Sequence, residues 1–393
     1  MTPQAFRADS VKARVSSPLG TGRHARERES LREVSDTTGC GQNRTLLVGV
    51  SRPREVTSRV TTVTVIALAG GSSINTAGLM DTLLKTDRAW QMLRDPDAEP
   101  VFDVRLVGLD DRPIACRDGV VLHPHAVATE LAPPDLVVVP GLDDDLELAF
   151  GLNGDWVPLI AKWHAAGSRV ATSCTGAFLA AEAGVLDGKQ ATTHWIAARE
   201  FQRRFPRVHL TPERMIVDAG DVISSGGATT FLTLVIYLTE RYGGHERAVL
   251  AAKVLLVDGN RRSQLPYVAF APYRDHTDEL IHALQSFMEK QLRHRISVHD
   301  LAAQAAVSNR TLNRRFRAAT GETPRRYLQL VRIEQAKRLL ETTSTPVDSI
   351  TAAVGYRDPT GFRRAFLRTT GLSPREYRLK YGQQGQGAHQ EKT

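Results

Sequence analysis

The chain has 393 residues, of which 41% are apolar and 24% are charged, an ordinary balance for a water-soluble protein that is long enough for two domains. Its cysteines, at positions 40, 116 and 174, are far apart and form no CxxC pair, which argues against a disulfide framework or a zinc site. Because there is neither an apolar run of about 18 residues nor an apolar leader, we expect no membrane span, no secretory signal and a cytoplasmic protein.

The net charge of +8 is unevenly distributed along the chain. Residues 1–59 carry +5, residues 60–275 carry −6 and residues 276–393 carry +9. An acidic middle followed by a basic end indicates a domain for a neutral or cationic ligand joined to a polyanion-binding domain. Charge alone leaves open the alternative that the basic end is only a solvated face.

Both ends of the chain have the composition of disordered segments. Residues 1–58 are rich in Arg, Ser, Thr and Gly and lack a sustained apolar period, so we predict a disordered extension. This extension either adds nonspecific DNA affinity or is an idle tail. We predict a second disordered tail at residues 383–393.

Residues 59–257 alternate apolar strands with helices and form the first predicted domain. The pattern predicts strands at 62–71, 103–108, 135–142, 168–174 and 221–227, and helices at 74–86, 156–167, 175–186 and 228–244. Strands that are apolar throughout and alternate with helices indicate a parallel sheet covered on both faces. Ligands of such sheets bind beyond the carboxyl ends of the strands, where Gly70, Gly71, Gly141, Cys174 and Ser225 fall.

Cys174 stands where a predicted strand gives way to a helix, in the stretch VATSCTG. This order is that of a nucleophile elbow, in which a tight turn exposes a reactive side chain above the sheet. It raises the hypothesis of a cysteine hydrolase.

Residues 258–275 are rich in Gly, Pro and polar groups and form a predicted linker, followed by a helical domain at 276–382. This domain contains an internal repeat with an offset of 50 residues. LNRRF at 312–316 matches FRRAF at 362–366, and the pairs TG, PR and Tyr that follow keep the same offset. Each copy predicts a helix, a tight turn and a second helix, with Ser308 and Asp358 as N-caps of the second helices.

The second helix of each copy has an apolar face and a polar, basic face. Leu312 with Phe316, and Phe362 with Phe366, are four residues apart and should face the core. The residues left to face outward are Arg310, Asn313, Arg314, Thr360, Arg363 and Arg364. Arginine and asparagine make bidentate contacts with base edges in the major groove, although each of these residues could instead hold a phosphate.

The helix predicted between the two copies, at 324–342, is about 28 Å long. This length is close to the roughly 34 Å between successive major grooves on one face of B-DNA. The two recognition helices could therefore enter adjacent grooves.

Residues 283–381 resemble the double helix-turn-helix domain of the AraC/XylS family. The resemblance is carried by the long stretch ITAAVGYRDPTGFRRAFLRTTGLSPREYR. It implies a double-stranded DNA operator as partner, with RNA polymerase as a further candidate.

Residues 60–245 resemble the class I glutamine amidotransferase-like superfamily of the ThiJ/PfpI type, and most closely its GlxA-like branch. The matching stretches include TVTVIALAGGSSINTAGLMD, DLVVVPGL and VATSCTGAFLAAEAGVLDGKQATTHW. The resemblance implies a flavodoxin-like α/β sandwich and a homodimer. In hydrolytic members Cys174 would be the nucleophile and His194 would lie beside it.

One position departs from the pattern of the active relatives. Asn75 stands where they place a carboxylate, and an amide cannot act as a general base near neutral pH. We therefore expect no catalysis and a ligand site at Asn75, Gly141, Cys174, Thr175 and His194.

The sequence thus predicts a DNA-binding transcriptional regulator whose amidotransferase-like domain senses a small molecule, such as an amine or amino-acid metabolite. The alternatives are a cysteine-dependent hydrolase acting through Cys174 and His194, and a thiol redox sensor. No cofactor is expected. No metal is expected either, because the His123 and His125 pair lacks a third ligand at a usable spacing.

Overall fold

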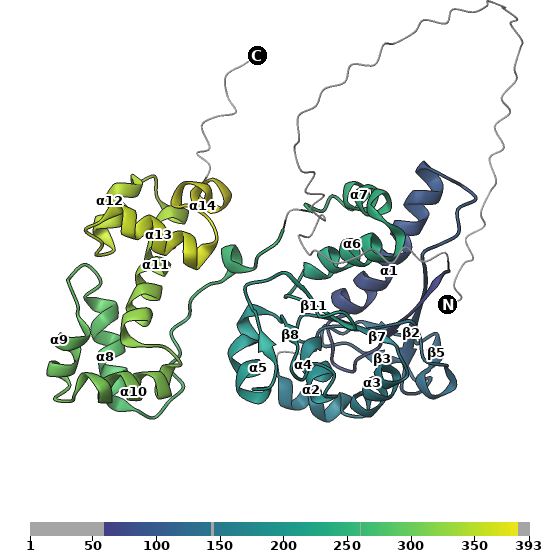
Figure 1. Cartoon of the computed structure of the whole chain (residues 1–393), viewed down its shortest axis with the longest axis horizontal. Coiled ribbons are helices and arrows are strands. Elements are labelled where there is room, and N and C mark those ends of the chain that lie inside the picture. The colour runs from purple at the N-terminus through teal and green to yellow at the C-terminus, as the bar shows by residue number, and fades with distance from the viewer. Residues whose placement is uncertain (1–58, 143–144, 260, 384–393) are drawn as a thin grey trace, which may run out of the picture. The chain divides into compact units, whose positions relative to one another are not determined.

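The computed structural model describes residues 59–142, 145–259 and 261–383, and the predicted disordered segments at 1–58 and beyond 383 lie outside these residues. An α/β domain comes first along the chain, and an all-helical domain follows it (Figure 1). This is the predicted order of fold classes. Among the described residues, no helix combines the length and apolar character needed to span a bilayer.

A seven-stranded sheet with the order β10-β11-β7-β6-β1-β2-β5 forms the centre of the α/β domain. The seven strands of this sheet are β1 Thr61–Ile66, β2 Phe102–Gly108, β5 Ala126–Val127, β6 Leu136–Val139, β7 Arg169–Ser173, β10 Ile216–Asp218 and β11 Val222–Ser225. Two small sheets pair β3 Ile114–Ala115 with β4 Val121–Leu122, and β8 Gln190–Ala191 with β9 His209–Leu210. All neighbours in this sheet pair in parallel except β10 with β11. The predicted parallel sheet is confirmed, with an antiparallel strand at one edge.

Helices cover both faces of the sheet, as the apolar strands predict. They are α1 Ser73–Leu93, η1 Ala128–Glu130, α2 Leu146–Asn153, α3 Trp156–Ala165, α4 Gly176–Glu182, η2 Trp195–Ala197, α5 Ala198–Arg204, α6 Thr230–Gly243 and α7 His245–Val254, followed by η3 Leu265–Tyr267. Val137 and Val139 of β6 pack with α3 and α4 in one core cluster, whereas Leu136 and Val138 pack with α1 and α6 in another. Successive residues of a strand point to opposite faces, so one buried strand contributes to both cores.

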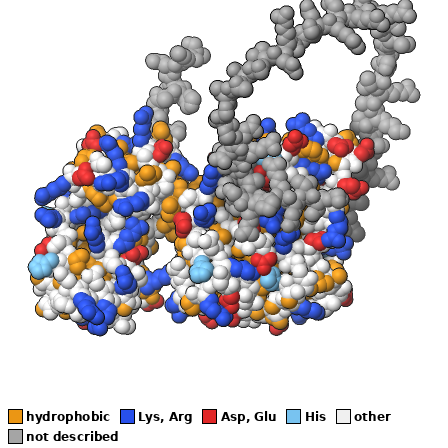
Figure 2. Space-filling model, viewed as in Figure 1, with side chains coloured by type: hydrophobic (Ala, Val, Ile, Leu, Met, Phe, Trp, Pro, Cys, Tyr) orange, Lys and Arg blue, Asp and Glu red, His pale blue; other side chains and the backbone are white. Residues whose placement is uncertain are grey.

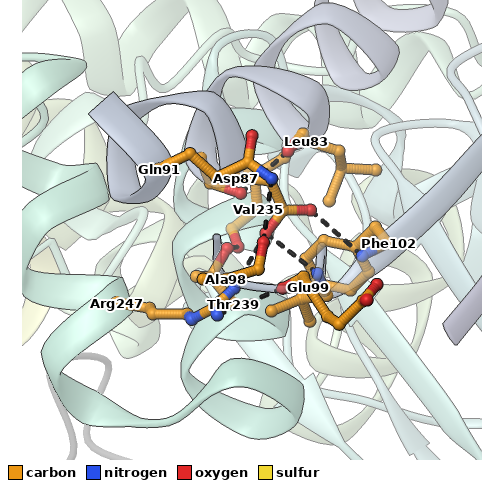
Figure 3. A network of polar contacts seen from close by, with 11 residues as sticks. Leu83, Asp87, Gln91, Ala98, Glu99, Phe102, Val235, Thr239 and Arg247 are labelled. Atoms are coloured by element: carbon orange, nitrogen blue, oxygen red, sulfur yellow. Dashed lines mark hydrogen bonds and ion pairs between the residues drawn. The ribbon is translucent and has the colours of Figure 1, made fainter. Parts of the chain in front are cut away.

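A buried carboxylate joins α1 and α7 to the start of β2 (Figure 3). Asp87 accepts hydrogen bonds from the backbone N–H groups of Val101 (3.0 Å) and Phe102 (3.1 Å), and its ion pair with Arg247 measures 3.2 Å. Burial raises the pKa of Asp87, and these three donors oppose that shift. The network lies at the amino end of the strands, away from the edge where Cys174 falls, so we assign it a structural role.

The helical domain consists of two helix-turn-helix units around a long connecting helix. Its helices are α8 Glu279–Lys290, α9 Val298–Gln304, α10 Asn309–Thr320, α11 Pro324–Thr342, α12 Val347–Ala353, α13 Pro359–Thr370 and α14 Pro374–Tyr381. Each unit has its own core cluster, and α11 contributes to both. The predicted N-caps are present, since Ser308 accepts from the N–H of Thr311 and Asp358 from those of Thr360 and Gly361.

Candidate functional site

Cys174 forms a tight turn between β7 and α4 at the centre of the sheet. Its φ of 56° lies in the left-handed region, which costs a residue with a Cβ about 1–2 kcal/mol. Two hydrogen bonds hold this conformation, from the N–H of Cys174 to the carbonyl oxygens of Ser225 (3.2 Å) and Gly226 (3.0 Å). The elbow geometry expected from the sequence is therefore present, and the neighbouring strand β11 keeps it in place.

Four of the five residues predicted to bind a ligand lie together at the carboxyl ends of β6 and β7. A Cβ placed on Gly141 would lie 3.2 Å from the Cβ of Cys174, 3.6 Å from the Oγ1 of Thr175 and 3.7 Å from the Cγ of Asn75. The hydroxyl of Thr175 donates to the carbonyl oxygen of Leu142 (3.1 Å). Glycine at position 141 thus lets the backbone after β6 approach the elbow closely.

The side chain of Asn75 connects the start of α1 to the end of β7. Its Oδ1 accepts a hydrogen bond from the hydroxyl of Ser173 (2.8 Å), and its Nδ2 donates to the Oγ of Ser72 (3.3 Å). Only 4% of Asn75 is exposed. This neutral amide positions the residue before Cys174 and has no titratable proton to exchange with the thiol near neutral pH.

The fifth predicted ligand residue, His194, lies on the β11 side of the elbow. Its ring packs directly on Gly227, where a Cβ would come within 1.6 Å of the ring Cδ2. Its Nδ1 accepts from the N–H of Ile196 (3.1 Å), so a neutral ring carries its proton on Nε2. The preceding residue, Thr193, donates from Oγ1 to the carbonyl oxygen of Cys174 (2.9 Å), which links the TTHW stretch to the elbow.

Gln264 is a part of this site that the sequence interpretation missed. It lies in the predicted linker, yet only 2% of it is exposed. Its Nε2 donates to the carbonyl oxygen of Thr193 (2.9 Å), and its Oε1 accepts from the N–H of Gly227 (3.3 Å). A Cβ on Gly226 would lie 2.4 Å from the Cδ of Gln264. The Gly226-Gly227 pair after β11 was the available signal, because adjacent glycines often mark a close approach of other groups.

Two further histidines of the α/β domain have local contacts. His164 contacts Asp221 through Nε2 (2.9 Å), and the Nδ1 of His125 accepts from the N–H of Leu106 (3.3 Å). Within residues 59–142, 145–259 and 261–383, no group of three or more His, Cys, Asp or Glu side chains is arranged to hold a metal ion. Cys116 is buried, and burial together with the charge of Asp118 raises its thiol pKa.

The predicted DNA-contacting residues lie on the exposed faces of α10 and α13. Those with exposed side chains are Arg310, Arg314, Thr360, Arg363 and Arg364. Asn313 is half-buried, and its Nδ2 donates to the carbonyl oxygen of Asn309 (2.8 Å). On the opposite faces, Leu312, Phe316, Phe362 and Phe366 are 0% exposed, as their spacing predicts.

Basic side chains gather over the helices of this domain. Figure 2 shows Lys and Arg side chains concentrated over the lobe that contains α8 to α14, with few acidic ones among them. Arg363 has a carboxylate partner, Asp348 at 3.3 Å, and both side chains are largely exposed. Such an exposed pair is weak and is easily exchanged for a phosphate contact.

Comparison with known proteins identifies both domains. Residues 80–241 match the DJ-1/PfpI family, and residues 301–380 match a helix-turn-helix domain family. The first match covers β2, β6, β7 and the elbow, and the second covers α10, α11 and α13.

Several known proteins are similar to half of this chain or more. The HTH-type transcriptional regulator GbdR of Pseudomonas aeruginosa is 26% identical over 273 residues, covering 69% of this chain and 73% of that protein. The HTH-type transcriptional regulator GlxA of Rhizobium meliloti is 27% identical over 217 residues, covering 55% of this chain and 67% of its own length. A solved structure described as a putative transcriptional regulator protein from Vibrio parahaemolyticus covers 50% of this chain and 100% of its own, with 21% identity and a TM-score of 0.43.

The chain is therefore a DNA-binding transcriptional regulator that joins a DJ-1/PfpI-type α/β domain to an AraC-type double helix-turn-helix domain. GbdR and GlxA, to which it is similar, are both named as HTH-type transcriptional regulators.

Proposed function

We propose that the α/β domain binds a small effector at the Cys174 elbow and that the helical domain reads an operator with α10 and α13. The observation that carries the DNA-reading part is the repeat. Two recognition helices with matched basic faces are joined by a 19-residue helix, α11, whose length of about 28 Å suits adjacent major grooves. We propose Arg310, Asn313, Arg314, Thr360, Arg363 and Arg364 as the contacting residues.

Selection of bound fragments from the host genome tests this proposal. Wild-type protein should enrich a small set of fragments over random duplex DNA. Arg314→Ala and Arg364→Ala should each weaken binding to an enriched fragment by about 1–3 kcal/mol while leaving random DNA less affected. Arg338→Ala is the matched control, because Arg338 is exposed but lies near the carboxyl end of α11, outside both recognition helices. Failure of the wild-type protein to enrich any fragment would contradict operator reading.

The elbow supports ligand binding better than turnover. Backbone groups after β6 and β7 and the Thr175 hydroxyl lie together there, and the His194 ring packs on Gly227 after the neighbouring strand β11, but the amide of Asn75 supplies no general base. We propose that the domain is catalytically inactive and that its effector is an amine or amino-acid metabolite, which suits the net charge of −6 of residues 60–275.

Thiol chemistry at Cys174 is the second candidate, because the left-handed elbow places the cysteine as a nucleophile would be placed. A hydrolase predicts a turnover activity that Cys174→Ala abolishes. A redox sensor predicts that mild peroxide oxidises Cys174 reversibly and changes operator affinity. If Cys174→Ser still responds to the effector found by screening amines and amino acids, both thiol-based functions are excluded.

We propose Gln264 as the residue that couples effector binding to DNA binding. It contacts Gly227 and Thr193 beside the elbow, and the segment that follows it packs on the helical domain. The carbonyl oxygen of Val268 accepts from the Nζ of Lys337 (2.7 Å), and the N–H of Phe270 donates to Glu334 (3.0 Å). An effector that moves the Gly226-Gly227 backbone therefore changes the anchoring of this segment.

The coupling is tested by Gln264→Ala with Arg262→Ala, an exposed neighbour, as the control. Gln264→Ala should retain DNA binding but lose most of the change in operator affinity caused by the effector. An effector shifts the DNA-binding equilibrium only by its differential affinity for the two states. If the effector changes the operator affinity of Gln264→Ala as much as that of the wild type, Gln264 does not contribute to this difference.

We also propose a homodimer through the α/β domain and a contact with RNA polymerase. Co-purification of two differently tagged copies of the chain tests the homodimer, and pull-down of purified polymerase tests the second contact. Recovery of a single tag, or no retained polymerase, would contradict the corresponding proposal.

A further inference from the structure

Two adjoining hollows form one furrow in the helical domain. One measures about 650 Å³ and lies between the first half of α11 and α13, and the other, of about 560 Å³, lies between the loop before α9 and the turn after α12. Ile296, Arg332 and Tyr356 line both hollows. We call this continuous surface the arginine furrow.

The arginine furrow carries a strong positive charge. Besides Arg332, the first hollow is lined by Arg325, Arg364 and Arg368, and the second by Arg293, Arg295 and Arg357. Among the described residues, no acidic side chain lines either hollow. None of these six arginines forms an ion pair with an acidic side chain in the described part of the chain. Positive charges concentrated on a concave surface attract a polyanion.

Arg332 lies at the junction of the two hollows and is held there by backbone groups. Its guanidinium donates to the carbonyl oxygens of Leu292 (3.2 Å) and His294 (2.8 Å) and lies 5.7 Å from the ring centre of Tyr356. These partners carry no negative charge, and burial lowers the pKa of Arg332. A half-buried cation held by neutral groups is stabilised further when an anion binds next to it.

The position of the furrow relative to α13 indicates which polyanion it receives. Gly361, Arg364 and Arg368 of α13 form one wall, and Arg364 is also a proposed base-contacting residue. When α13 lies in a major groove, the sugar-phosphate backbone bordering that groove must pass beside the same helix. The backbone is therefore brought to the furrow by the docking that α13 requires.

We propose that the arginine furrow seats the phosphates of the duplex between the two half-sites read by α10 and α13. This inference rests on the proposed reading of DNA by these helices and adds a third contact surface, on α11. Contacts of this kind supply affinity that depends on salt but not on base sequence. They also fix the distance between the half-sites, because the intervening backbone is held.

The test compares two exposed arginines of α11 in the full-length protein. Arg325 lines the furrow and Arg338 does not, and both are exposed. The probes are a genome-selected duplex and a random duplex of equal length, each titrated from low to high NaCl. Arg325→Gln should lower the salt-dependence slope by about 0.9 on both probes, the value for one lost phosphate contact, and weaken binding at about 0.15 M salt roughly 3–10-fold. Arg338→Gln should leave the slope within error of the wild type.

A second variant and a footprint complete the test. Arg368→Gln should reproduce the effect of Arg325→Gln. Ethylation of the phosphates between the half-sites should weaken DNA binding by the wild type, but it should not further weaken binding by the variant that carries both Arg325→Gln and Arg368→Gln. An unchanged slope for Arg325→Gln and Arg368→Gln, or an equal change for Arg338→Gln, overturns the furrow. If the wild type itself shows no preference for the selected duplex, the operator-reading proposal fails instead, so the two failures are distinguishable.

Discussion

The two helix-turn-helix units share a framework but differ in what constrains their turns. In both units a tyrosine after the recognition helix donates to a glutamate, Tyr327 to Glu289 (2.6 Å) and Tyr377 to Glu341 (2.7 Å). In both, a glycine with positive φ ends the recognition helix, as its backbone freedom allows. The repeat in the sequence therefore reflects a repeated set of contacts.

The turns inside the two units are different. Ala306 has a φ of 51° in the first, and Gly355, at the equivalent position, has a φ of 82° in the second. A Cβ on Gly355 would lie 2.1 Å from the carbonyl oxygen of Leu292 and 2.9 Å from Arg332. The second turn is thus packed against the loop that precedes α9, whereas the first turn bears only local strain. Equivalent positions in a repeat can therefore differ in how closely neighbouring segments pack against them.

Substitution at Gly355 should have the largest effect. Gly355→Ala forces a Cβ against backbone and into positive φ, so we expect the second unit to lose about 3 kcal/mol of stability. Hydrogen exchange of the α13 amides in the full-length protein measures this loss. A change below about 1 kcal/mol would show that the Leu292 loop moves aside easily.

The tyrosine pairs come next. Glu289 has a second partner, Arg274 (2.7 Å), which would remain if Tyr327 were replaced. Glu341 accepts from Tyr377, and no second side-chain partner is seen for it among the described residues, so the loss of the Tyr377 hydroxyl should lower stability more. Burial and the neighbouring glutamate raise the pKa of Tyr377, which keeps its phenol protonated and able to donate. We expect Tyr377→Phe to cost about 1.5 kcal/mol and Tyr327→Phe about half of that, measured by urea unfolding. The reverse order would contradict this comparison.

The acid dependence of the two units should also differ. Arg315 of the first unit makes two hydrogen bonds to Asp278 (2.9 and 2.7 Å), and Ala365 occupies the equivalent position in the second. This arginine lowers the pKa of Asp278, so the pair stabilises the fold above the ordinary aspartate pKa of about 3.9, and its contribution is lost as the pH falls through the lowered value.

Asp278→Asn should therefore cost under about 1 kcal/mol at pH 7, the value of a partly exposed pair. Its difference from the wild type should narrow as the pH falls from about 5 towards 3 in hydrogen-exchange measurements on α8 and α10. Asp348→Asn, which removes an exposed partner of Arg363 in the second unit, is the control and should leave the hydrogen exchange of α8 and α10 at pH 7 unchanged. A gap that widens on acidification would exclude this role for Asp278.

The smallest expected effect is a gain. Ala306→Gly relieves a left-handed alanine but adds flexibility to the unfolded chain, so we expect a net stabilisation of about 0.5 kcal/mol. The thermal unfolding midpoints of Ala306→Gly and Gly355→Ala, measured side by side, compare opposite substitutions at equivalent positions of the repeat. A destabilised Ala306→Gly would mean that the first turn depends on the alanine side chain.

Local patterns account for much of what the sequence could predict. The parallel sheet followed from apolar runs, the recognition helices from the apolar spacing of Leu312 and Phe316, and the elbow from a cysteine between a strand and a helix. Each of these signals lies within a few residues of the feature it predicts, so one sequence is enough to detect it.

Contacts between distant segments were not predictable in the same way. Gln264 is one polar residue in a segment of linker-like composition, and nothing near it indicates that it is buried beside Thr193 and Gly227. Arg332 likewise belongs to a basic helix in the sequence, and only the fold brings it to the carbonyl oxygens of Leu292 and His294. Such pairings depend on chain topology rather than on local periodicity.

The burial of Gln264 has a practical meaning for building chimeric regulators. A sensor domain cut at residue 258, where the composition changes, would lose the side chain that packs on Gly226 and accepts a hydrogen bond from the N–H of Gly227. A fusion that keeps residues 259–264 retains this side chain, so transplanted sensors should be joined to foreign DNA-binding domains only beyond residue 264.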